Sequence, residues 1–239
     1  MKLLIDVGNS RIKWVIIDDH TRESKFLVSK GFVDIKDQSL FVKKNENSTF
    51  YKRLSNCIKQ ISKQGKKNTL KINKIAWICV APKVVERKVV EVLKSIFDTP
   101  PPKKIKVPVN GLCTLKLNCG SVEVSCIYDE PKTLGSDRWV ALIGLASLGP
   151  PKNFSRKNNH EMSLISAGTA TVMDRVVWKK IQNNKWMCLL QAGFIAPGFA
   201  KMRDSLDFVS RNSTKNCSKY NSYPKNTRDA ISSGIALCQ

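Results

Sequence analysis

The sequence predicts a mixed α/β protein built from two lobes, each beginning with a β-hairpin. Two observations carry this prediction. Two hairpin-like stretches, residues 3–16 and 163–176, align with each other without a gap, and strand-like and helix-like patterns alternate along the chain. With 239 residues and 42% hydrophobic residues, the chain could form one large domain or two compact lobes. The second hairpin lies where a second lobe should begin, which favours duplication of one unit.

In the first half, short apolar runs bounded by polar or breaking residues predict strands. These runs cover residues 2–7, 12–18, 25–32, 74–82 and, after the proline-rich break at 99–104, residues 105–109. Apolar residues at helical spacing predict two helices between the strands, over 49–64 and 84–97.

The second half shows fewer but longer elements. Residues 111–132 have no clear pattern and are expected to be irregular, and 149–161 and 212–226 are polar loops. Ordered elements are predicted elsewhere: a helix over 134–149, two strands around a turn over 163–178, a strand, glycine-rich turn and helix over 187–209, and a helix over 227–239.

The turn of each predicted hairpin is suited to holding phosphate. Gly8 and Gly168 align, and small residues follow each of them. Glycine lets the backbone approach an anion closely, so that successive N–H groups can point at it. Asp6 would not contact phosphate, because like charges repel, but it could hold Mg²⁺ through water. The alternative is a plain hairpin with a polar tip; two such turns facing each other across a cleft favour phosphate binding.

Other nucleotide and metal signatures are absent from the sequence. There is no G-x-x-x-x-G-K-[ST] loop and no G-x-G-x-x-G after a strand. The eight cysteines form no Cys-x-x-Cys pair, and the two histidines stand apart, so zinc-site spacing is missing. No apolar run approaches the roughly 18 residues of a membrane span, and Asp6 interrupts the first run. We therefore expect a cytoplasmic protein without a signal peptide or membrane partner, with reduced thiols.

The net charge of +22 invites a nucleic-acid partner. The 41 lysines and arginines are spread along the whole chain, however, and no arm or helix concentrates them. A binding footprint should cluster its charge, so we expect no nucleic-acid partner.

Four stretches, in this order, together resemble the type III pantothenate kinases, a family that includes the Bvg accessory factor proteins. They are DVGNSRIK (6–13), YDEPKTLGSDRW (128–139), SAGTATVMD (166–174) and GFIAPGFAKMRDSL (193–206), and DAISSGIA follows near the end. The resemblance implies the fold of the acetate and sugar kinase, Hsc70 and actin superfamily. Its two ribonuclease-H-like lobes would be residues 1–132, with the first phosphate loop, and 133–239, with the substrate loop and second phosphate loop. It also implies a homodimer that uses ATP to phosphorylate pantothenate, the first step of coenzyme A biosynthesis.

The resemblance assigns roles residue by residue. Asp137 would be the catalytic base that takes the hydroxyl proton, and Asp6 would organise Mg²⁺ with ATP. The residues expected to bind ATP and its phosphates are Asp6, Val7, Gly8, Asn9, Ser10, Arg11, Ile12, Lys13 and Thr169. The residues expected to bind the substrate are Tyr128, Gly135, Ser136, Asp137, Arg138 and Ser210. Each also has a plain structural alternative: Asp137, for example, could simply cap the helix that follows it.

The chain departs from the family pattern in two places. Many members carry an aspartate at the position of Ser166, where it helps bind a monovalent cation, K⁺ or NH₄⁺. A serine oxygen is a weaker cation ligand than a carboxylate, so we expect weaker cation binding or binding through backbone oxygens. The family also continues past the DAISSGIA helix to a Thr-Gly-Gly segment near the adenosine, whereas this sequence stops at Gln239. We therefore expect a shortened second lobe.

Two functions from different classes remain open at this point. The first is a pantothenate kinase, favoured by the paired phosphate turns and the G-x-D-R stretch. The alternative is a non-catalytic regulatory accessory protein, or an inactive truncated homologue of the kinase. The serine at 166, the shortened lobe and the high positive charge motivate it.

Overall fold

The computed structural model describes residues 1–18, 27–36, 47–64, 72–97, 103–151, 159–206 and 220–238. The fold is mixed α/β, as predicted, and contains two five-stranded sheets. Contacts divide the chain into two compact units. The first comprises Met1–Val107 and Lys132–Val140, and the second comprises Pro108–Pro131 and Ala141–Gln239. This division differs from the expected boundary between residues 132 and 133.

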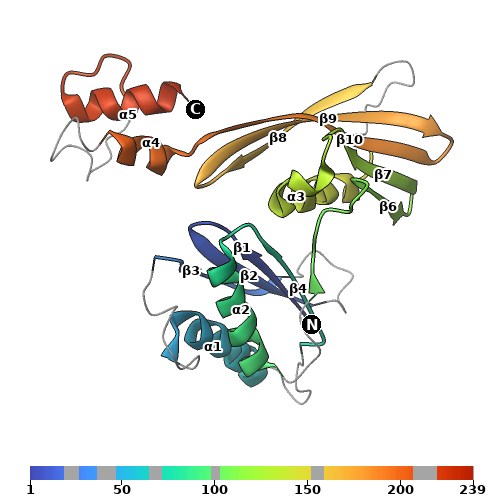
Figure 1. The fold of residues 1–239 in the computed structure, drawn as a ribbon, viewed down its shortest axis with the longest axis horizontal. Helices are drawn as coiled ribbons and strands as arrows, with labels where there is room; N and C mark the ends of the chain where they lie inside the picture. The colour runs from blue at the N-terminus through green and yellow to red at the C-terminus, as the bar shows by residue number, and fades with distance from the viewer. Residues whose placement is uncertain are drawn as a thin grey trace. The chain divides into compact units, whose positions relative to one another are not determined.

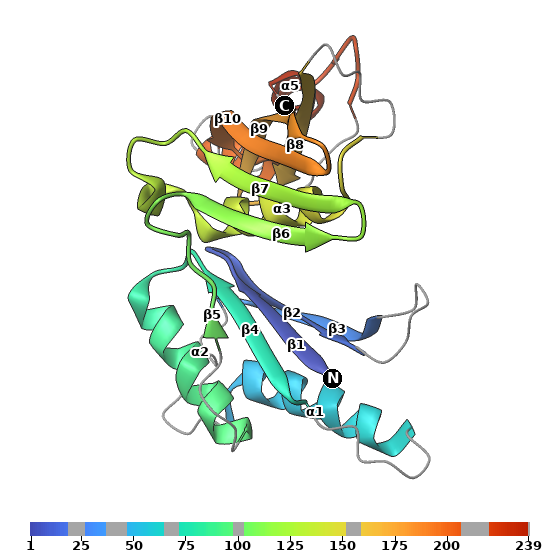
Figure 2. The same ribbon diagram turned by 90° about the vertical axis from the view of Figure 1, so that its right-hand side faces the viewer.

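The first unit contains a sheet in the order β3-β2-β1-β4-β5 (Figure 2). Its strands are β1 (Lys2–Val7), β2 (Arg11–Ile17), β3 (Leu27–Asp34), β4 (Lys74–Cys79) and β5 (Lys103–Lys104). β1 pairs antiparallel with β2 and parallel with β4, so it lies at the centre of the sheet. The ends of β1 and β4 therefore meet at one edge, where the first predicted turn begins.

Two helices cover one face of this sheet (Figure 1). They are α1 (Thr49–Gln64) and α2 (Lys83–Ile96), and both are strongly amphipathic. The alternating residues Leu3, Ile5 and Val7 of β1 face them and are buried in a shared core. Trp14 of β2 joins this core, and its ring lies edge-on to Phe50 of α1 with centroids 5.7 Å apart. This packing fixes β1, and with it the position of Asp6 on the opposite face.

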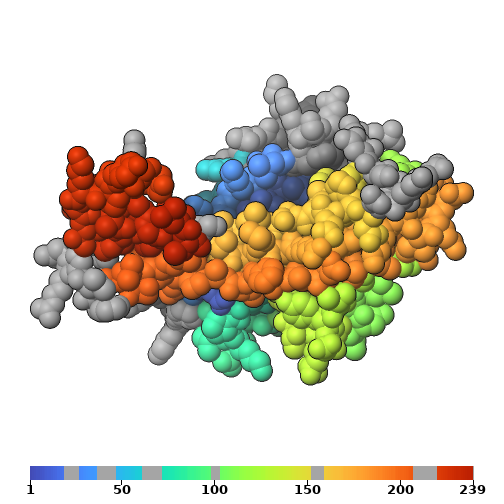
Figure 3. Space-filling view, turned by 90° about the horizontal axis from the view of Figure 1, so that it is seen from above, coloured from blue at the N-terminus to red at the C-terminus, as the bar shows by residue number. Residues whose placement is uncertain are grey.

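The second unit contains a sheet in the order β6-β7-β10-β9-β8. Its strands are β6 (Leu112–Leu117), β7 (Gly120–Cys126), β8 (His160–Ala167), β9 (Ala170–Gln182) and β10 (Lys185–Pro197). Figure 3 shows β8, β9 and β10 side by side as a yellow-to-orange band. The helices that follow the strands are α4 (Phe199–Ser205) and α5 (Thr227–Leu237). A short 3-10 helix, Pro131–Thr133, precedes α3 (Ser136–Ser147), whose last turns belong to this unit.

Most predicted elements are confirmed, with ends shifted by a few residues. Two predictions were wrong. The first concerns residues 111–132, which are largely a β-hairpin and not an irregular segment. Val122 and Val124 are fully buried and alternate with half-buried residues, which is the period of a strand. Gly120 makes the turn with φ +130°, a conformation that other residues rarely adopt. The short strand expected at 105–109 lies instead at Lys103–Lys104.

The two hairpins that align in sequence have turns of different length. Val7 pairs with Ile12 in the first hairpin, whereas Ala167 pairs with Thr171 in the second. The second turn is therefore one residue shorter than the gapless alignment implies. Both turns close on a similar hydrogen bond: the Gly8 N–H donates to the Arg11 carbonyl at 2.9 Å, and the Gly168 N–H donates to the Ala170 carbonyl at 3.0 Å. Among the described residues, no helix has the length and apolar character that crossing a membrane requires.

Candidate active site

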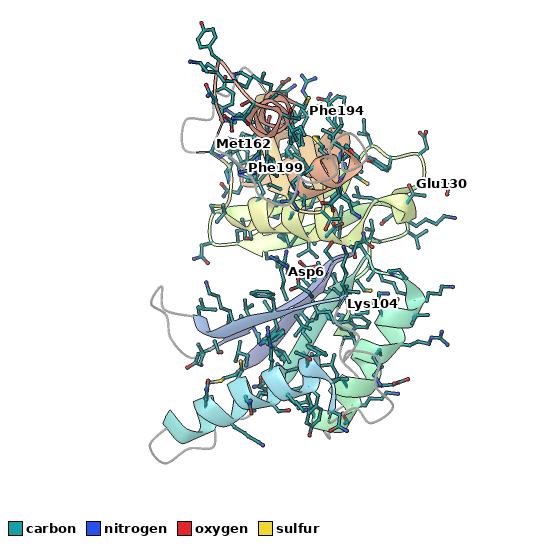
Figure 4. All side chains as sticks on the ribbon, turned by 90° about the vertical axis from the view of Figure 1, so that its left-hand side faces the viewer. Asp6, Lys104, Glu130, Met162, Phe194 and Phe199 are labelled. Atoms are coloured by element: carbon teal, nitrogen blue, oxygen red, sulfur yellow. The ribbon has the colours of Figure 1, made fainter. Side chains whose placement is uncertain are left out.

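Asp6 lies near the end of β1, on the sheet face opposite the two helices (Figure 4). Its cross-strand partner is Lys13 on β2, and the Lys13 Nζ lies 3.6 Å from the Asp6 Oδ2. Its parallel neighbour on β4 is Ile78. The Asp6 side chain is 39% exposed, so the carboxylate is accessible to a ligand.

The surroundings of Asp6 raise the pKa of its carboxyl group. Burial is the largest cause, because it disfavours the charged form. The carboxylate of Asp137 raises the pKa further, whereas the positive charge of Lys13 lowers it. A bound cation would offset the cost of burying the negative charge of Asp6 and would reduce its repulsion with Asp137. The site therefore favours a positively charged ligand.

The residues predicted to bind ATP in and around the turn after Asp6 differ in burial. Val7 and Ile12 are fully buried in the core, so their side chains cannot contact ATP. Arg11 is exposed and pairs with Asp34, its Nε 2.8 Å from Oδ1. Gly8, Asn9 and Ser10 remain at the tip, of which Asn9 is exposed.

The predicted substrate loop leads into helix α3. Gly135 accepts the first helical hydrogen bond, from the Trp139 N–H at 3.0 Å. The Ser136 hydroxyl donates to the Cys79 carbonyl at 3.4 Å, which ties the loop to the end of β4. Asp137 is exposed, and its Oδ1 accepts a hydrogen bond from the Arg138 N–H at 2.9 Å. The Asp137 side chain thus bonds the N–H of the next residue, whereas a capping side chain would accept from an N–H two or three residues further on. The carboxylate still faces solvent.

The structure therefore groups the first phosphate turn and the substrate loop in one unit, and the charges of Asp6 and Asp137 interact there. Arg138, by contrast, is only 6% exposed. Its guanidinium is therefore poorly accessible to the substrate that it was predicted to bind. This grouping follows from the pairing of β1 with β4, since β4 ends beside the loop.

An apolar pocket of about 340 Å³ adjoins Asp6 in the same unit. Such a volume is at the lower end of the range typical of small-molecule sites. The residues lining it are Leu4, Ile5, Asp6, Lys13, Trp14, Val15, Ala76, Trp77, Ile78, Ile105 and Val140. Sequence reasoning missed this pocket. One signal in the sequence could have indicated an apolar surface near the predicted base: Val140 follows Asp137 by three residues and so lies on the same face of α3 as Asp137.

The other predicted site residues belong to the second unit or are not described. Thr169 lies in the turn between β8 and β9, where its carbonyl accepts a hydrogen bond from the Gly198 N–H at 3.0 Å. Ser166 is exposed on β8, and Tyr128 is half-buried after β7. Ser210 lies outside the described residues.

The residues around Asp6 fit a magnesium ion that arrives with a nucleotide. Within the described part of the chain, no group of three or more His, Cys, Asp or Glu could form an all-protein metal cage. Mg²⁺ in phosphoryl-transfer sites is commonly held by one or two carboxylates, waters and substrate phosphates. One accessible carboxylate beside a second acid, with a raised pKa, matches that requirement.

Comparison with known proteins places the chain among the kinases. A family model described as type III pantothenate kinase matches residues 2–239. The chain therefore belongs to the type III pantothenate kinase family.

The individual relatives share limited sequence identity with this chain. The type III pantothenate kinase of Azoarcus sp. is 36% identical over 113 residues, which are 47% of this chain and 36% of that protein. The enzyme of Leptothrix cholodnii is 26% identical over 98% of this chain and 74% of its own length. A solved Baf family protein from Campylobacter jejuni aligns over 99% of this chain and 74% of its own, with 19% identity and a TM-score of 0.45. That structural likeness is too loose to carry an argument about the fold.

Proposed function

We propose that this protein transfers the γ-phosphoryl group of ATP to the primary hydroxyl of pantothenate, the first step of coenzyme A biosynthesis. One observation carries the proposal: in a chain of this family, Asp6 at the end of β1 and Asp137 at the start of α3 lie in one unit, and hydrogen bonds connect the end of β4 to both elements. Phosphoryl transfer needs mainly positioning and charge stabilisation, which two such acids and a phosphate turn can supply.

In this proposal, Asp137 accepts the proton of the attacking hydroxyl. Its carboxylate is exposed and is oriented by the hydrogen bond from the Arg138 N–H, so one oxygen remains available to a substrate. The turn of Gly8, Asn9 and Ser10 offers N–H and side-chain donors to the phosphates, and Lys13 adds a positive charge beside them. Mg²⁺, held through Asp6 and water, would neutralise phosphate charge.

The pocket beside Asp6 would take the apolar part of the acceptor. Pantothenate carries two methyl groups on the carbon next to its reacting hydroxymethyl group. Val140 lines this pocket and lies one helical turn after Asp137, so we place the methyl groups against Val140 when the hydroxyl faces Asp137. Burying each methyl group against apolar side chains contributes about 0.8 kcal/mol, which favours pantothenate over smaller hydroxy acids.

The remaining roles rest on the family alone. We propose that Thr169 belongs to a second phosphate loop, that Tyr128 and Ser210 contact pantothenate, and that Ser166 marks a weakened K⁺ or NH₄⁺ position. By the same argument, the two units are the ribonuclease-H-like lobes of the acetate and sugar kinase, Hsc70 and actin superfamily. The protein would act as a cytoplasmic homodimer.

The test is ADP release by the purified protein with ATP and Mg²⁺, with and without pantothenate, in K⁺, NH₄⁺ and Na⁺. We expect turnover that depends on pantothenate. Equal rates in the three salts would mean that Ser166 has removed the cation requirement. A folded protein without turnover in any salt would overturn the proposal and would favour the alternative function, a non-catalytic accessory protein.

A further inference from the structure

We propose that Gly135 and Ser136 are positioning residues that act through Asp137, and that neither contributes by contacting the substrate. The inference rests on the proposed function, because it assumes that Asp137 is the base. It assigns a physical task to two positions that the family resemblance marks only as substrate-binding.

Gly135 makes room for the Asp137 carboxylate. A Cβ atom at position 135 would overlap Asp137 Oδ1 and would lie 3.6 Å from its Cγ. The next atom, Cγ1 of Val80, would be at 3.9 Å, an ordinary contact. The carboxylate is therefore packed directly over the α-carbon of Gly135.

The backbone at Gly135 does not itself require glycine. Among the described residues, the glycines with positive φ are Gly111, Gly120 and Gly149, and Gly135 is not one of them. An alanine could adopt this conformation without strain. The single obstacle to a side chain here is the carboxylate of Asp137, which ties the two residues together.

Ser136 ties the start of α3, which carries Asp137, to the end of β4. Its hydroxyl donates to the Cys79 carbonyl at 3.4 Å, at the end of β4. The next residue of that strand end, Val80, donates its N–H to the Val7 carbonyl at 3.0 Å. The start of α3 is thus connected through β4 to the strand that carries Asp6, so the two acids share one framework.

An alanine at 135 must push the Asp137 carboxylate aside. Rotation away from position 135 would cost Oδ1 its hydrogen bond from the Arg138 N–H, which is 2.9 Å long. A base displaced by about 1 Å loses roughly a hundredfold in rate. Since the substrate would still bind, we expect kcat to fall about 100-fold for Gly135→Ala, while KM for pantothenate and for ATP changes less than about twofold.

A matched control lies in the same helix. Gly144 has no atom within 4 Å of the position that a Cβ would occupy. Gly144→Ala should therefore leave kcat unchanged and keep or raise the melting temperature. Ser136→Ala should lower kcat less than Gly135→Ala does, and Ser136→Thr, which keeps the hydroxyl, should restore much of that loss. A rise in KM for pantothenate at unchanged kcat in Gly135→Ala would overturn the inference in favour of direct substrate contact.

A double-mutant cycle in thermal stability tests the inference without activity. Gly135→Ala should lower the melting temperature in the wild-type background but not in an Asp137→Ala background, where the obstacle is gone. Equal shifts in both backgrounds would contradict the inference. If the wild type shows no turnover, the proposed function fails, yet this cycle still decides whether Gly135 positions Asp137.

Discussion

Lys13 and Asp6 face each other across β1 and β2, with the Lys13 Nζ 3.6 Å from the Asp6 Oδ2. The side chains are 60% and 39% exposed, so solvent weakens the attraction and the pair contributes little to stability. The same exposure leaves the lysine free to move toward a phosphate. We therefore interpret the pair as part of a ligand site in which Lys13 partly offsets the negative charge of two acids.

Replacing Lys13 should affect ligand binding more than folding. For Lys13→Met, we expect a free energy of unfolding within about 1 kcal/mol of the wild type, as for other exposed ion pairs. KM for ATP should rise about tenfold, because one charge contact with phosphate is lost. Urea unfolding and initial rates measure the two effects. Lys116→Met, in the β6–β7 hairpin of the second unit, is the control and should change neither quantity.

The raised pKa of Asp6 predicts a pH-dependent stability difference between the wild type and Asp6→Asn. An unfolded aspartate ionises near pH 3.8, whereas folded Asp6 ionises at a higher pH. Folded Asp6 thus holds its proton more tightly, and the resulting stabilisation is present below pH 3.8 and lost as the pH rises through the folded pKa. Asparagine does not ionise, so Asp6→Asn does not lose this stabilisation as the pH rises.

We therefore expect Asp6→Asn to gain stability relative to the wild type as the pH rises through that window, in metal-free and nucleotide-free buffer. Urea unfolding at a series of pH values from about 3.5 to 7 measures the difference. A difference that stays constant, or that moves in favour of the wild type with rising pH, would show that the folded pKa of Asp6 is not raised.

The pocket beside Asp6 predicts a coupling between a side chain and a substrate group. In the wild type, an analogue of pantothenate that lacks both methyl groups should lose about tenfold or more in kcat/KM. In Val140→Ala the loss should be smaller, because part of the apolar contact has already gone. Val84→Ala, exposed on α2 and outside the pocket, is the control. An equal loss in wild type and Val140→Ala would place the methyl groups elsewhere.

The cysteines should differ in reactivity according to their burial. Cys188 is fully buried, and burial raises the pKa of its thiol to about 12, whereas Cys119 and Cys238 are exposed. At pH 8 a thiol reagent should modify the two exposed cysteines quickly and Cys188 only after unfolding, since the thiolate is the reactive form. Peptide mass mapping after timed labelling measures this order. Fast modification of Cys188 in the folded protein would contradict the packing of β10.

The first unit could be predicted from the sequence because its elements are locally consistent. The apolar run before Asp6, the helical spacing of 49–64 and 84–97, and the run over 74–82 each mark one element, and each element forms. The β6–β7 hairpin was missed because the exposed side chains Leu112 and Cys119 obscure its period of two.

The sequence predicted which residues belong to the candidate site but not how they are arranged in space. Asp6 and Asp137 stand 131 positions apart in the sequence, and nothing local indicates that β4 brings the G-x-D-R loop beside β1. The pocket was invisible for the same reason, because Leu4, Ile78 and Val140 come from three separate elements. The burial of Val7, Ile12 and Arg138 likewise depends on packing, which a motif does not report.

The role of Asp137 is tested most directly by measuring phosphoryl transfer by the wild type and by Asp137→Asn. Labelled γ-phosphate of ATP should appear on pantothenate, with the product identified by mass as the monophosphate. We expect transfer by the wild type and a loss of about 10²–10⁴-fold in kcat for Asp137→Asn, the range typical of a lost base, with KM for ATP little changed. Transfer by Asp137→Asn at the wild-type rate would contradict the central claim that Asp137 is the base.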